Sequence, residues 1–152
     1  DIEDFKKKLD KKSRLMGIDP GKKRVGIAIS DENKIVATPY TTLIKIDYTK
    51  FLSELRLIIK ENNIKGIIIG NPINMNGSAG PSSQSAKDLA RNLSKDITEN
   101  ITMWDERLSS QGAFNLTNNL EVNTSKIVKK LDENAAQFIL QGALDYLTKE
   151  NT

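Results

Sequence analysis

The sequence predicts an α/β fold in which helices flank a mixed five-stranded sheet, made of a three-stranded antiparallel meander and two parallel strands. Three observations lead to this prediction. Three strand patterns with short connections open the chain, which favours an antiparallel meander. Segments with helical and strand periodicity then alternate, as in right-handed parallel crossovers. The length of 152 residues suits a single domain.

The first part of the chain is expected to hold one short helix and the meander. Apolar residues at helical spacing predict a short amphipathic helix within residues 1–12. Two turn signals, Asp19-Pro20-Gly21 and Asp31-Glu32-Asn33, separate the strand patterns. The three strands are predicted at Arg14–Ile18, Arg24–Ser30 and Lys34–Thr38.

The middle of the chain alternates helix and strand patterns. Residues 48–61 carry apolar side chains at helical spacing, and Asp47 before them is a suitable N-cap. Residues 65–70 form a short apolar run, as expected for a strand that is buried on both faces. Residues 71–83 are rich in Pro, Gly and Asn and are expected to form a long loop, a kind of segment that is usually functional.

The last part of the chain is expected to end in a long amphipathic helix. The elements before it are predicted as a helix at 84–96, a strand at 101–104, a helix capped by Ser109 or Ser110 that ends near Asn119, and a polar, basic loop at 120–130. Asp132 is expected to cap the final helix, residues 133–149. The apolar stripe of this helix is predicted to contain Ala136, Phe138, Ile139, Leu140, Ala143, Leu144 and Leu147.

One domain is expected over residues 14–150, with residues 1–13 as an N-terminal extension. The charged N-terminus lacks the apolar stretch of a signal peptide. Apolar runs such as residues 66–70 are too short to span a bilayer. We therefore expect a soluble, cytoplasmic protein without a membrane partner.

Composition excludes several classes of enzyme. The chain has no Cys, which excludes thiol nucleophiles and thiolate metal sites, and no His, which excludes a Ser-His-Asp triad and His-based zinc sites. Acid–base chemistry in this chain falls to carboxylates, Lys, Tyr or metal-bound water. The net charge of +3 is too small to identify a nucleic-acid partner by itself.

Carboxylates gather at the predicted strand ends. Asp19 ends the first strand, Asp105 and Glu106 follow the last strand, and Asp132 begins the last helix. Because parallel strands present their carboxyl ends at one edge of a sheet, these acids are expected to converge there. Like charges brought together need a cation between them, and oxygen ligands favour Mg²⁺ or Mn²⁺. Such ions support phosphodiester cleavage without any histidine.

Each of these acids also has an ordinary structural explanation. Asp19 can serve as a turn residue, Glu106 can form a surface ion pair, and Asp132 can act only as an N-cap. Alternation along a strand sends Asp105 and Glu106 to opposite sides, so only one of them is expected to face a metal ion. The sequence alone leaves open which one does.

Basic residues adjoin the acids in the sequence. Lys22, Lys23 and Arg24 directly follow the turn at Asp19 and can neutralise phosphates of a nucleic acid, although a solvated hairpin explains them equally well. A second basic group, with the same two explanations, consists of Lys126, Lys129 and Lys130 in front of Asp132.

Two further residues at the end of the last strand have assigned roles. Arg107 can orient Glu106 or bind a phosphate through two hydrogen bonds, and we favour the orienting role. Trp104 ends an apolar strand and is expected to be a core residue rather than a platform for base stacking.

Four segments carry a specific combination of motifs, in one order, between residues 14 and 148. They are residues 17–31 (GIDPGKKRVGIAISD), 69–78 (IGNPINMNGS), 105–110 (DERLSS) and 131–141 (LDENAAQFILQ). Together they resemble the YqgF/RuvX family of bacterial proteins. The resemblance implies an RNase H-like fold and kinship with Holliday junction resolvases. Asn71 departs from the pattern, because the family often has Leu there.

The resemblance also implies a function. Asp19, Glu106 and Asp132 would be the catalytic acids and the ligands of Mg²⁺ or Mn²⁺ in a metal-dependent nuclease. Its expected substrate is the 5′ end of the precursor of 16S ribosomal RNA (pre-16S rRNA), processed during ribosome biogenesis. The residues expected to bind substrate are Lys22, Lys23, Arg24, Arg107, Lys129 and Lys130.

The sequence allows three alternatives to this function. The first is a Holliday junction resolvase, which normally acts as a dimer. The sequence therefore leaves open whether the substrate is RNA or branched DNA, and whether the protein is a monomer or a homodimer. The second is a nucleic-acid-binding protein without turnover. The third, an actin-like ATPase or sugar kinase, shares the Gly-Ile-Asp-x-Gly pattern of the first strand but needs two lobes and a longer chain.

Overall fold

The structure is a computed structural model that describes residues 2–9, 12–72, 81–105 and 124–149. For residues 81–82, 124–130 and 149 it describes the backbone only. Within these residues, no helix combines the length and the hydropathy that are needed to cross a bilayer.

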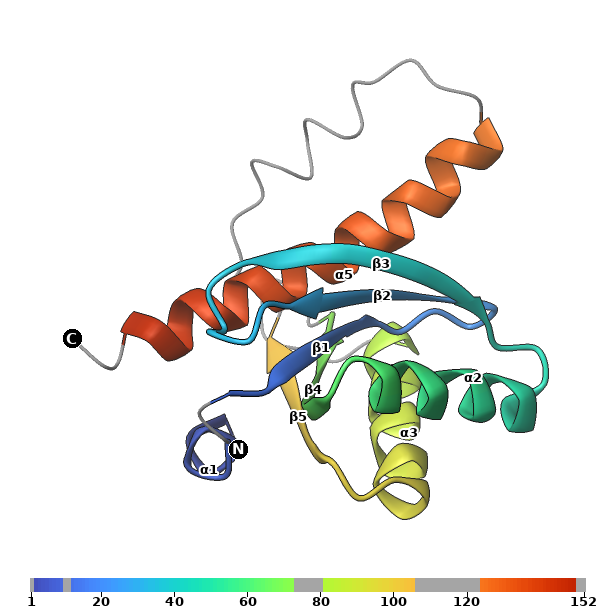
Figure 1. The fold of residues 1–152 in the computed structure, drawn as a ribbon. Helices are drawn as coiled ribbons and strands as arrows, with labels where there is room; N and C mark the ends of the chain where they lie inside the picture. Colours follow the sequence, from blue (N-terminus) through green and yellow to red (C-terminus); the bar gives the residue numbers. More distant parts are fainter. Residues whose placement is uncertain (1, 10–11, 73–80, 106–123, 150–152) are drawn as a thin grey trace.

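The centre of the described part of the molecule is one five-stranded sheet with the order β3-β2-β1-β4-β5 (Figure 1). The strands are β1 (Arg14–Asp19), β2 (Arg24–Ser30), β3 (Ala37–Ile44), β4 (Ile64–Asn71) and β5 (Asn100–Asp105). Antiparallel pairing joins β1, β2 and β3, whereas β4 runs parallel to β1 and β5 runs parallel to β4. The predicted mixed sheet is therefore confirmed.

Helices cover both faces of this sheet (Figure 1). α2 (Tyr48–Glu61) and α3 (Pro81–Asp96) pack on one face, and α1 (Ile2–Lys7) and α5 (Thr124–Lys149) pack on the other. Strand alternation divides the apolar residues between the faces. Met16 and Ile18 join the core under α2 and α3, whereas Leu15 joins the core under α5. The sheet thus separates two apolar layers.

The start of α2 follows the sequence prediction. Asp47 is the N-cap, and its Oδ1 accepts hydrogen bonds from the backbone N–H groups of Thr49 and Lys50 at 3.0 and 3.4 Å. The apolar positions of the helix are buried against the sheet: Phe51, Leu52, Leu55, Ile58 and Ile59. Cap and stripe together fix where the helix begins and which side it presents to the core.

Two glycines allow α5 to lie directly on the sheet. A Cβ atom added at Gly26 would lie 1.9 Å from the carbonyl oxygen of Asp132, and one added at Gly17 would lie 2.6 Å from Leu140 Cβ. Such distances leave no room for a side chain, so the helix backbone can approach β1 and β2 only because both positions are glycine. This close approach sets the position of Asp132.

The predicted third strand, Lys34–Thr38, is wrong at its start, because a turn occupies its first residues. Lys34 has a positive φ of 60°. The Asp31 carboxylate accepts hydrogen bonds from the backbone N–H groups of Ile35 and Val36 at 2.7 and 2.9 Å. These bonds fold the chain back after β2, so that β3 begins at Ala37 and continues to Ile44.

Replacing Asp31 by Ala is expected to lower the free energy of unfolding by about 1 kcal/mol. The hydrogen bond from the backbone N–H of Val36 is the largest effect on the pKa of Asp31 and lowers it below its ordinary value of 3.8. Burial, the second-largest effect, opposes this, and the backbone N–H groups of Ile35 and Asn33 lower the pKa further. Because the folded state has the lower pKa, this stabilisation is fully present above about pH 4 and is lost as the pH falls through the folded pKa.

Urea unfolding of wild type and Asp31→Ala at pH 7, 5 and 3 measures this effect. The difference between the two proteins should be equal at pH 7 and 5 and smaller at pH 3. Asp31→Asn, which keeps one acceptor oxygen, should lose less stability than Asp31→Ala. A difference that grows at pH 3 would contradict the assigned role of the carboxylate.

The predicted start of the last helix is also wrong. α5 begins at Thr124, so residues 124–130 are helical rather than a loop, and Asp132 lies inside the helix and is not its N-cap. The predicted buried stripe is confirmed from Ala136 to Leu147 except at Phe138, which is only partly buried. The long loop predicted at 71–83 is wrong at both ends, because β4 includes Asn71 and α3 begins at Pro81, and residues 73–80 lie outside the described residues. The helix predicted from Ser109 or Ser110 to Asn119 lies outside the described residues.

Candidate functional site

Asp19 and Asp132 meet at the carboxyl edge of the sheet. Asp19 is the last residue of β1 and pairs with Gly26 of β2. Alternation places Asp19 on the same face as Gly17, the face that α5 covers. Since the backbone of Asp132 rests on Gly26, the helix brings Asp132 to the end of β1. Two acids that are far apart in the sequence are therefore neighbours in the fold.

The burial of Asp19 and its closeness to Asp132 shift the pKa of Asp19. Burial in the first place, and the negative charge of Asp132 in the second, raise the pKa of Asp19 from its ordinary value of 3.8 to about 6. An acid held in this way is poorly solvated and faces a like charge. A cation placed between the two carboxylates would relieve both effects.

Arg24 already balances part of this charge. Its Nε donates a hydrogen bond to Asp132 Oδ2 at 2.9 Å, with the Arg24 side chain 52% exposed and the Asp132 side chain 20% exposed. Arg24 begins β2 and lies on the same sheet face as Gly26, so the ion pair ties the hairpin to α5. The sequence prediction assigned Arg24 to substrate and missed this pair. The signal that was available is Gly26, which marks the place where another backbone approaches β2.

Asp105 lies on the other face of the sheet from Asp19. Its neighbour Trp104 is 3% exposed in the core under α5 and contacts Tyr146 edge-on, with ring centroids 5.5 Å apart, which confirms the prediction of a core residue. Alternation then turns Asp105 toward α3. Asn71, its partner across β4 and β5, accepts a hydrogen bond from Ser83 of α3 at 2.6 Å, in agreement with this placement.

The structure describes only part of the predicted site. Lys22 and Lys23 are exposed in the hairpin between β1 and β2. Lys126, Lys129 and Lys130 belong to the first part of α5, where only the backbone is described. Glu106 and Arg107 lie outside the described residues.

The donor chemistry of the acid pair fits a hard divalent cation. Asp19 and Asp132 offer carboxylate oxygens only, and the chain has no His or Cys that would favour a softer metal. Among the described residues, no group of three or more acids is placed to hold a metal ion. A complete ligand set therefore needs a donor from beyond this pair.

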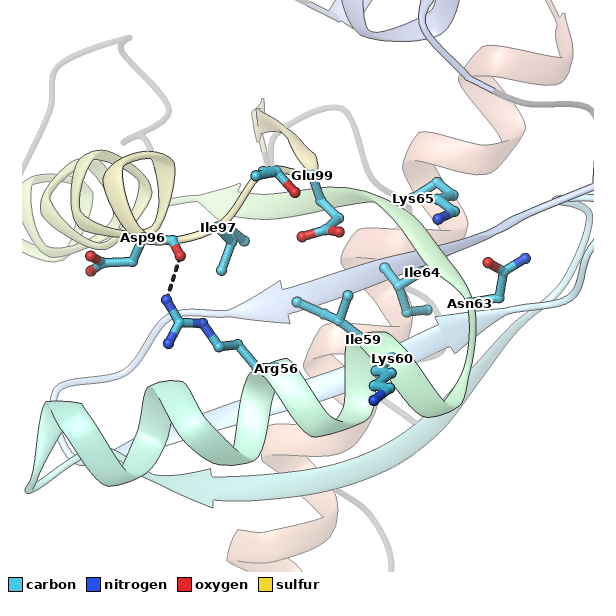
Figure 2. Close-up of a pocket in the computed structure, with 10 residues that line it drawn as sticks. Arg56, Ile59, Lys60, Asn63, Ile64, Lys65, Asp96, Ile97 and Glu99 are labelled. Atoms are coloured by element: carbon cyan, nitrogen blue, oxygen red, sulfur yellow. Dashed lines mark hydrogen bonds between the residues drawn. The ribbon is translucent and has the colours of Figure 1, made fainter.

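A hollow of about 430 Å³ lies at the amino ends of the parallel strands, opposite the acid pair and near the start of β4 (Figure 2). Its lining mixes the positive side chains of Arg56, Lys60 and Lys65 with the acids Asp96 and Glu99. Arg56 donates a hydrogen bond to the carbonyl oxygen of Asp96 at 2.6 Å and so caps the end of α3. This contact has a structural explanation that needs no ligand.

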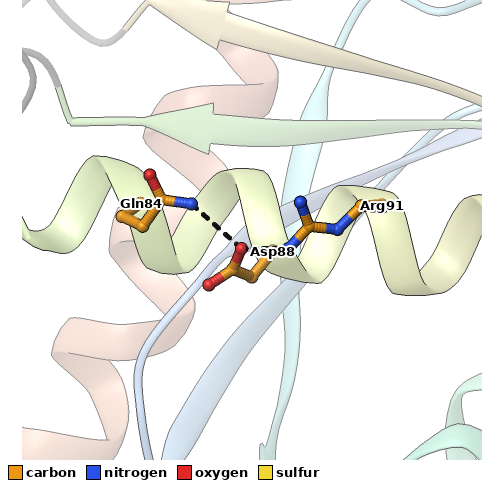
Figure 3. A network of polar contacts seen from close by, with 3 residues as sticks. All are labelled: Gln84, Asp88 and Arg91. Atoms are coloured by element: carbon orange, nitrogen blue, oxygen red, sulfur yellow. Dashed lines mark hydrogen bonds and ion pairs between the residues drawn. The ribbon is translucent and has the colours of Figure 1, made fainter.

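Polar residues on the surface of α3 form a local network (Figure 3). Gln84 Nε2 donates a hydrogen bond to Asp88 Oδ1 at 3.0 Å, and Arg91 pairs with the same carboxylate. The spacings of four and three residues are those of side-chain pairs that stabilise a helix. The network is therefore explained by α3 alone.

Comparisons with known proteins agree with this fold. Residues 13–146 match the family model of RuvX, described as Holliday junction resolvase. A protein of Pelagibacter ubique (strain HTCC1062) named "Putative pre-16S rRNA nuclease" is 55% identical over 146 residues, which are 96% of this chain and 97% of that protein.

Two solved structures share the fold at low sequence identity. The yeast mitochondrial Holliday junction resolvase Ydc2 gives a TM-score of 0.55 at 12% identity. The match covers 99% of this chain and 85% of the Ydc2 chain. RuvC of T. thermophilus in complex with a Holliday junction substrate gives a TM-score of 0.52 at 6% identity. The match covers 91% of this chain and 96% of the RuvC chain. Both are RNase H-like, so the predicted fold class is confirmed.

Proposed function

Because this chain belongs to the RuvX family, we propose that it is a nuclease that hydrolyses phosphodiester bonds with the help of a divalent cation. The observation that carries the proposal is the approach of Asp132 to Asp19 at the carboxyl edge of the sheet. This edge is where ligands of open α/β sheets bind. The activity is placed in a single domain of residues 14–150, with residues 1–13 as an extension.

The proposed catalytic acids and metal ligands are Asp19, Glu106 and Asp132. Asp105 is left out of the proposed set, and the support for this choice is that strand alternation turns Asp105 to the face that α3 covers. When bound, Mg²⁺ or Mn²⁺ supplies positive charge that stabilises the transition state of phosphodiester hydrolysis. The carboxylates would hold that charge at the sheet edge, and the packing of α5 on β2 brings Asp132 beside Asp19 for this purpose.

Basic residues around the acids are proposed to hold the substrate through its phosphates. The set consists of Lys22, Lys23, Arg24, Arg107, Lys129 and Lys130. Phosphate contacts of this kind position a nucleic acid without reading its sequence. Arg107 is also proposed to orient Glu106.

The favoured substrate is the 5′ end of pre-16S rRNA. The support is the 55% identity, over almost the whole of both chains, to a relative that bears the name of a pre-16S rRNA nuclease. Because ribosomal RNA is processed where ribosomes are assembled, the proposal includes a cytoplasmic location. Branched DNA is the second candidate, favoured by the family description and by the shared fold of RuvC.

A cleavage assay with two substrates tests the proposal. Purified protein is incubated with a structured pre-16S rRNA fragment or a four-way DNA junction, in Mn²⁺ or in EDTA, and its mass is measured in the same buffer. We expect cleavage of the RNA in Mn²⁺ only. Paired cuts in the junction by a dimer would favour the second candidate, and binding without cleavage of either substrate would contradict the nuclease proposal.

Replacing Arg24 by Ala is expected to strengthen Mn²⁺ binding about two- to fivefold in the absence of nucleic acid. The Arg24 guanidinium occupies Asp132 Oδ2 and so competes with a cation for that oxygen. Calorimetry or the paramagnetic resonance signal of free Mn²⁺ measures the affinity.

Lys22→Ala is the matched control for this variant. It removes the same charge from the same hairpin but leaves the pair of Arg24 and Asp132 in place. The gain should be clearly larger for Arg24→Ala than for the control. Weaker Mn²⁺ binding by Arg24→Ala would contradict the competition.

A further inference from the structure

Two exposed isoleucines lie at the same edge of the sheet as Asp19. Ile44, the last residue of β3, is 53% exposed, and Ile46 in the connection to α2 is 80% exposed. The hairpin between β1 and β2 ends at this edge as well, and the two connections lie side by side at one end of the sheet (Figure 1). Large apolar side chains beside a catalytic edge call for a physical reason.

The isoleucines and the hairpin form one continuous surface. Ile44 pairs directly with Arg24 across β2 and β3. The next residue, Lys45, donates its backbone N–H to the carbonyl oxygen of Lys23 at 2.7 Å. We name this surface the hairpin rim and define it as Lys22, Lys23, Arg24, Ile44 and Ile46. Its five residues include three cations and no acid.

The exposure of Ile46 is not explained by a loose backbone. The next residue, Asp47, is held as the N-cap of α2 by hydrogen bonds from Thr49 and Lys50. The residue before an N-cap often packs against the fourth residue of the helix, which here is Phe51. Phe51 is fully buried in the core, whereas Ile46 points into solvent on an anchored backbone. The start of α2 therefore does not account for this side chain.

We propose that the hairpin rim binds unpaired nucleotides of the nucleic-acid substrate, with Ile44 and Ile46 against the faces of the bases and the three cations on the phosphates. The inference rests on the proposed nuclease function. Charge complementarity favours this occupant, because a nucleic acid alternates anionic phosphates with apolar base faces. Apolar side chains inserted beside bases are also a known way to hold nucleotides out of a stack.

The position of the hairpin rim gives it a defined role. Thr42 of β3 is level with Asp19 across β2, and Ile44 lies two residues further along. With about 4.8 Å between strands and about 3.3 Å per residue, the backbone of Ile44 lies about 12 Å from that of Asp19. A strand held on the rim therefore leads directly to the acid pair. Because the contacts use base faces rather than base edges, the rim should favour unpaired over duplex substrate without preferring one base.

The experiment compares a double variant with a matched control in binding assays. Ile44→Thr with Ile46→Thr keeps the β-branched shape and all charges of the hairpin rim. Ile35→Thr makes the same change at a residue that is 58% exposed beyond the other end of β3. The probe is a fluorescent single-stranded RNA oligonucleotide in EDTA, intact or with abasic sites. Salt dependence and unfolding midpoints are measured in parallel.

The double variant is expected to bind intact RNA about three- to tenfold more weakly than wild type, with an unchanged salt slope and unfolding midpoint. Ile35→Thr should bind like wild type. The abasic oligonucleotide should bind equally to wild type and the double variant, because the contacted bases are gone.

Other outcomes would overturn the inference. Equal binding of intact RNA by the double variant and wild type would contradict the proposed contacts of Ile44 and Ile46 with the bases, even if wild type cleaves RNA normally. A lower molecular mass of the double variant would assign the surface to an interface between copies of the chain. If wild type neither binds nor cleaves RNA or branched DNA, the proposed nuclease function fails as well.

Discussion

Asp19→Asn is expected to reduce metal-dependent cleavage by about 10³-fold or more, because a neutral amide cannot replace the charge of a metal ligand. Asp19 ends β1 beside Asp132 and is a buried acid of the proposed site. Single-turnover cleavage of the pre-16S rRNA fragment in Mg²⁺ measures the loss. Activity within tenfold of wild type would contradict the assignment of Asp19.

The same variant should not lose stability. The folded pKa of Asp19, about 6, lies above the unfolded value of 3.8. The folded state therefore binds this proton more tightly, and the free energy of unfolding falls as the pH rises from about 4 to 6. Above pH 6 the ionised carboxylate costs on the order of 3 kcal/mol, which Asp19→Asn removes.

Thermal unfolding in EDTA separates these two effects. The midpoint of Asp19→Asn relative to wild type should rise between pH 4.5 and 6.5 and then stay level. An inactive variant with a lower midpoint at pH 7 would show that the substitution damages the fold, and the activity assay would then say nothing about the metal.

Gly26→Ala is expected to lower the free energy of unfolding by about 2–4 kcal/mol and to impair cleavage. The added Cβ would lie 1.9 Å from the carbonyl oxygen of Asp132, which is backbone and can yield only if α5 moves. Moving α5 shifts Asp132 away from Asp19. Urea unfolding and the cleavage assay measure the two consequences.

Thr38→Ala is a suitable control for Gly26→Ala. Thr38 is an exposed residue of β3, so its truncation should change stability by no more than about 0.5 kcal/mol. Wild-type stability and activity in Gly26→Ala would mean that α5 does not rest on β2 at this point.

Local sequence signals were sufficient for much of the fold. β2 and α2 have the predicted bounds, because alternation, periodicity and the Asp47 cap act within a few residues. β3 was misplaced because Ile35 and Val36 have strand-like side chains, whereas the Asp31 carboxylate holds their backbone in a turn. The hydrogen bonds of the Asp31 side chain thus outweigh the β-strand propensity of Ile35 and Val36.

The start of α5 could not be predicted from periodicity. An apolar stripe marks only the turns that bury apolar side chains, which begin at Ala136, whereas Asp132 contacts the sheet through its backbone at Gly26. Residues 124–130 are mostly polar or basic in sequence, with only Ile127 and Val128 apolar, which is too few to mark a helical stripe. As a result, Asp132 was assigned to a helix end although the helix continues through it.

The candidate site was predictable in part. The position of Asp19 follows from the strand and turn around it, which are local features. The ion pair between Arg24 and Asp132 joins residues 108 positions apart and depends on how closely a helix packs on a glycine. Distances of this kind are set by tertiary packing, which no single segment encodes.

The division of the interior by the sheet has a practical consequence for protein engineering. Gly26, Arg24 and Asp132 all belong to the layer of α5, whereas α2 and α3 fill the other layer. Repacking the second layer, for example around Leu55 or Leu93, offers a route to a heat-resistant form whose turnover is unaltered. Directed-evolution libraries aimed at robustness are best restricted to that half.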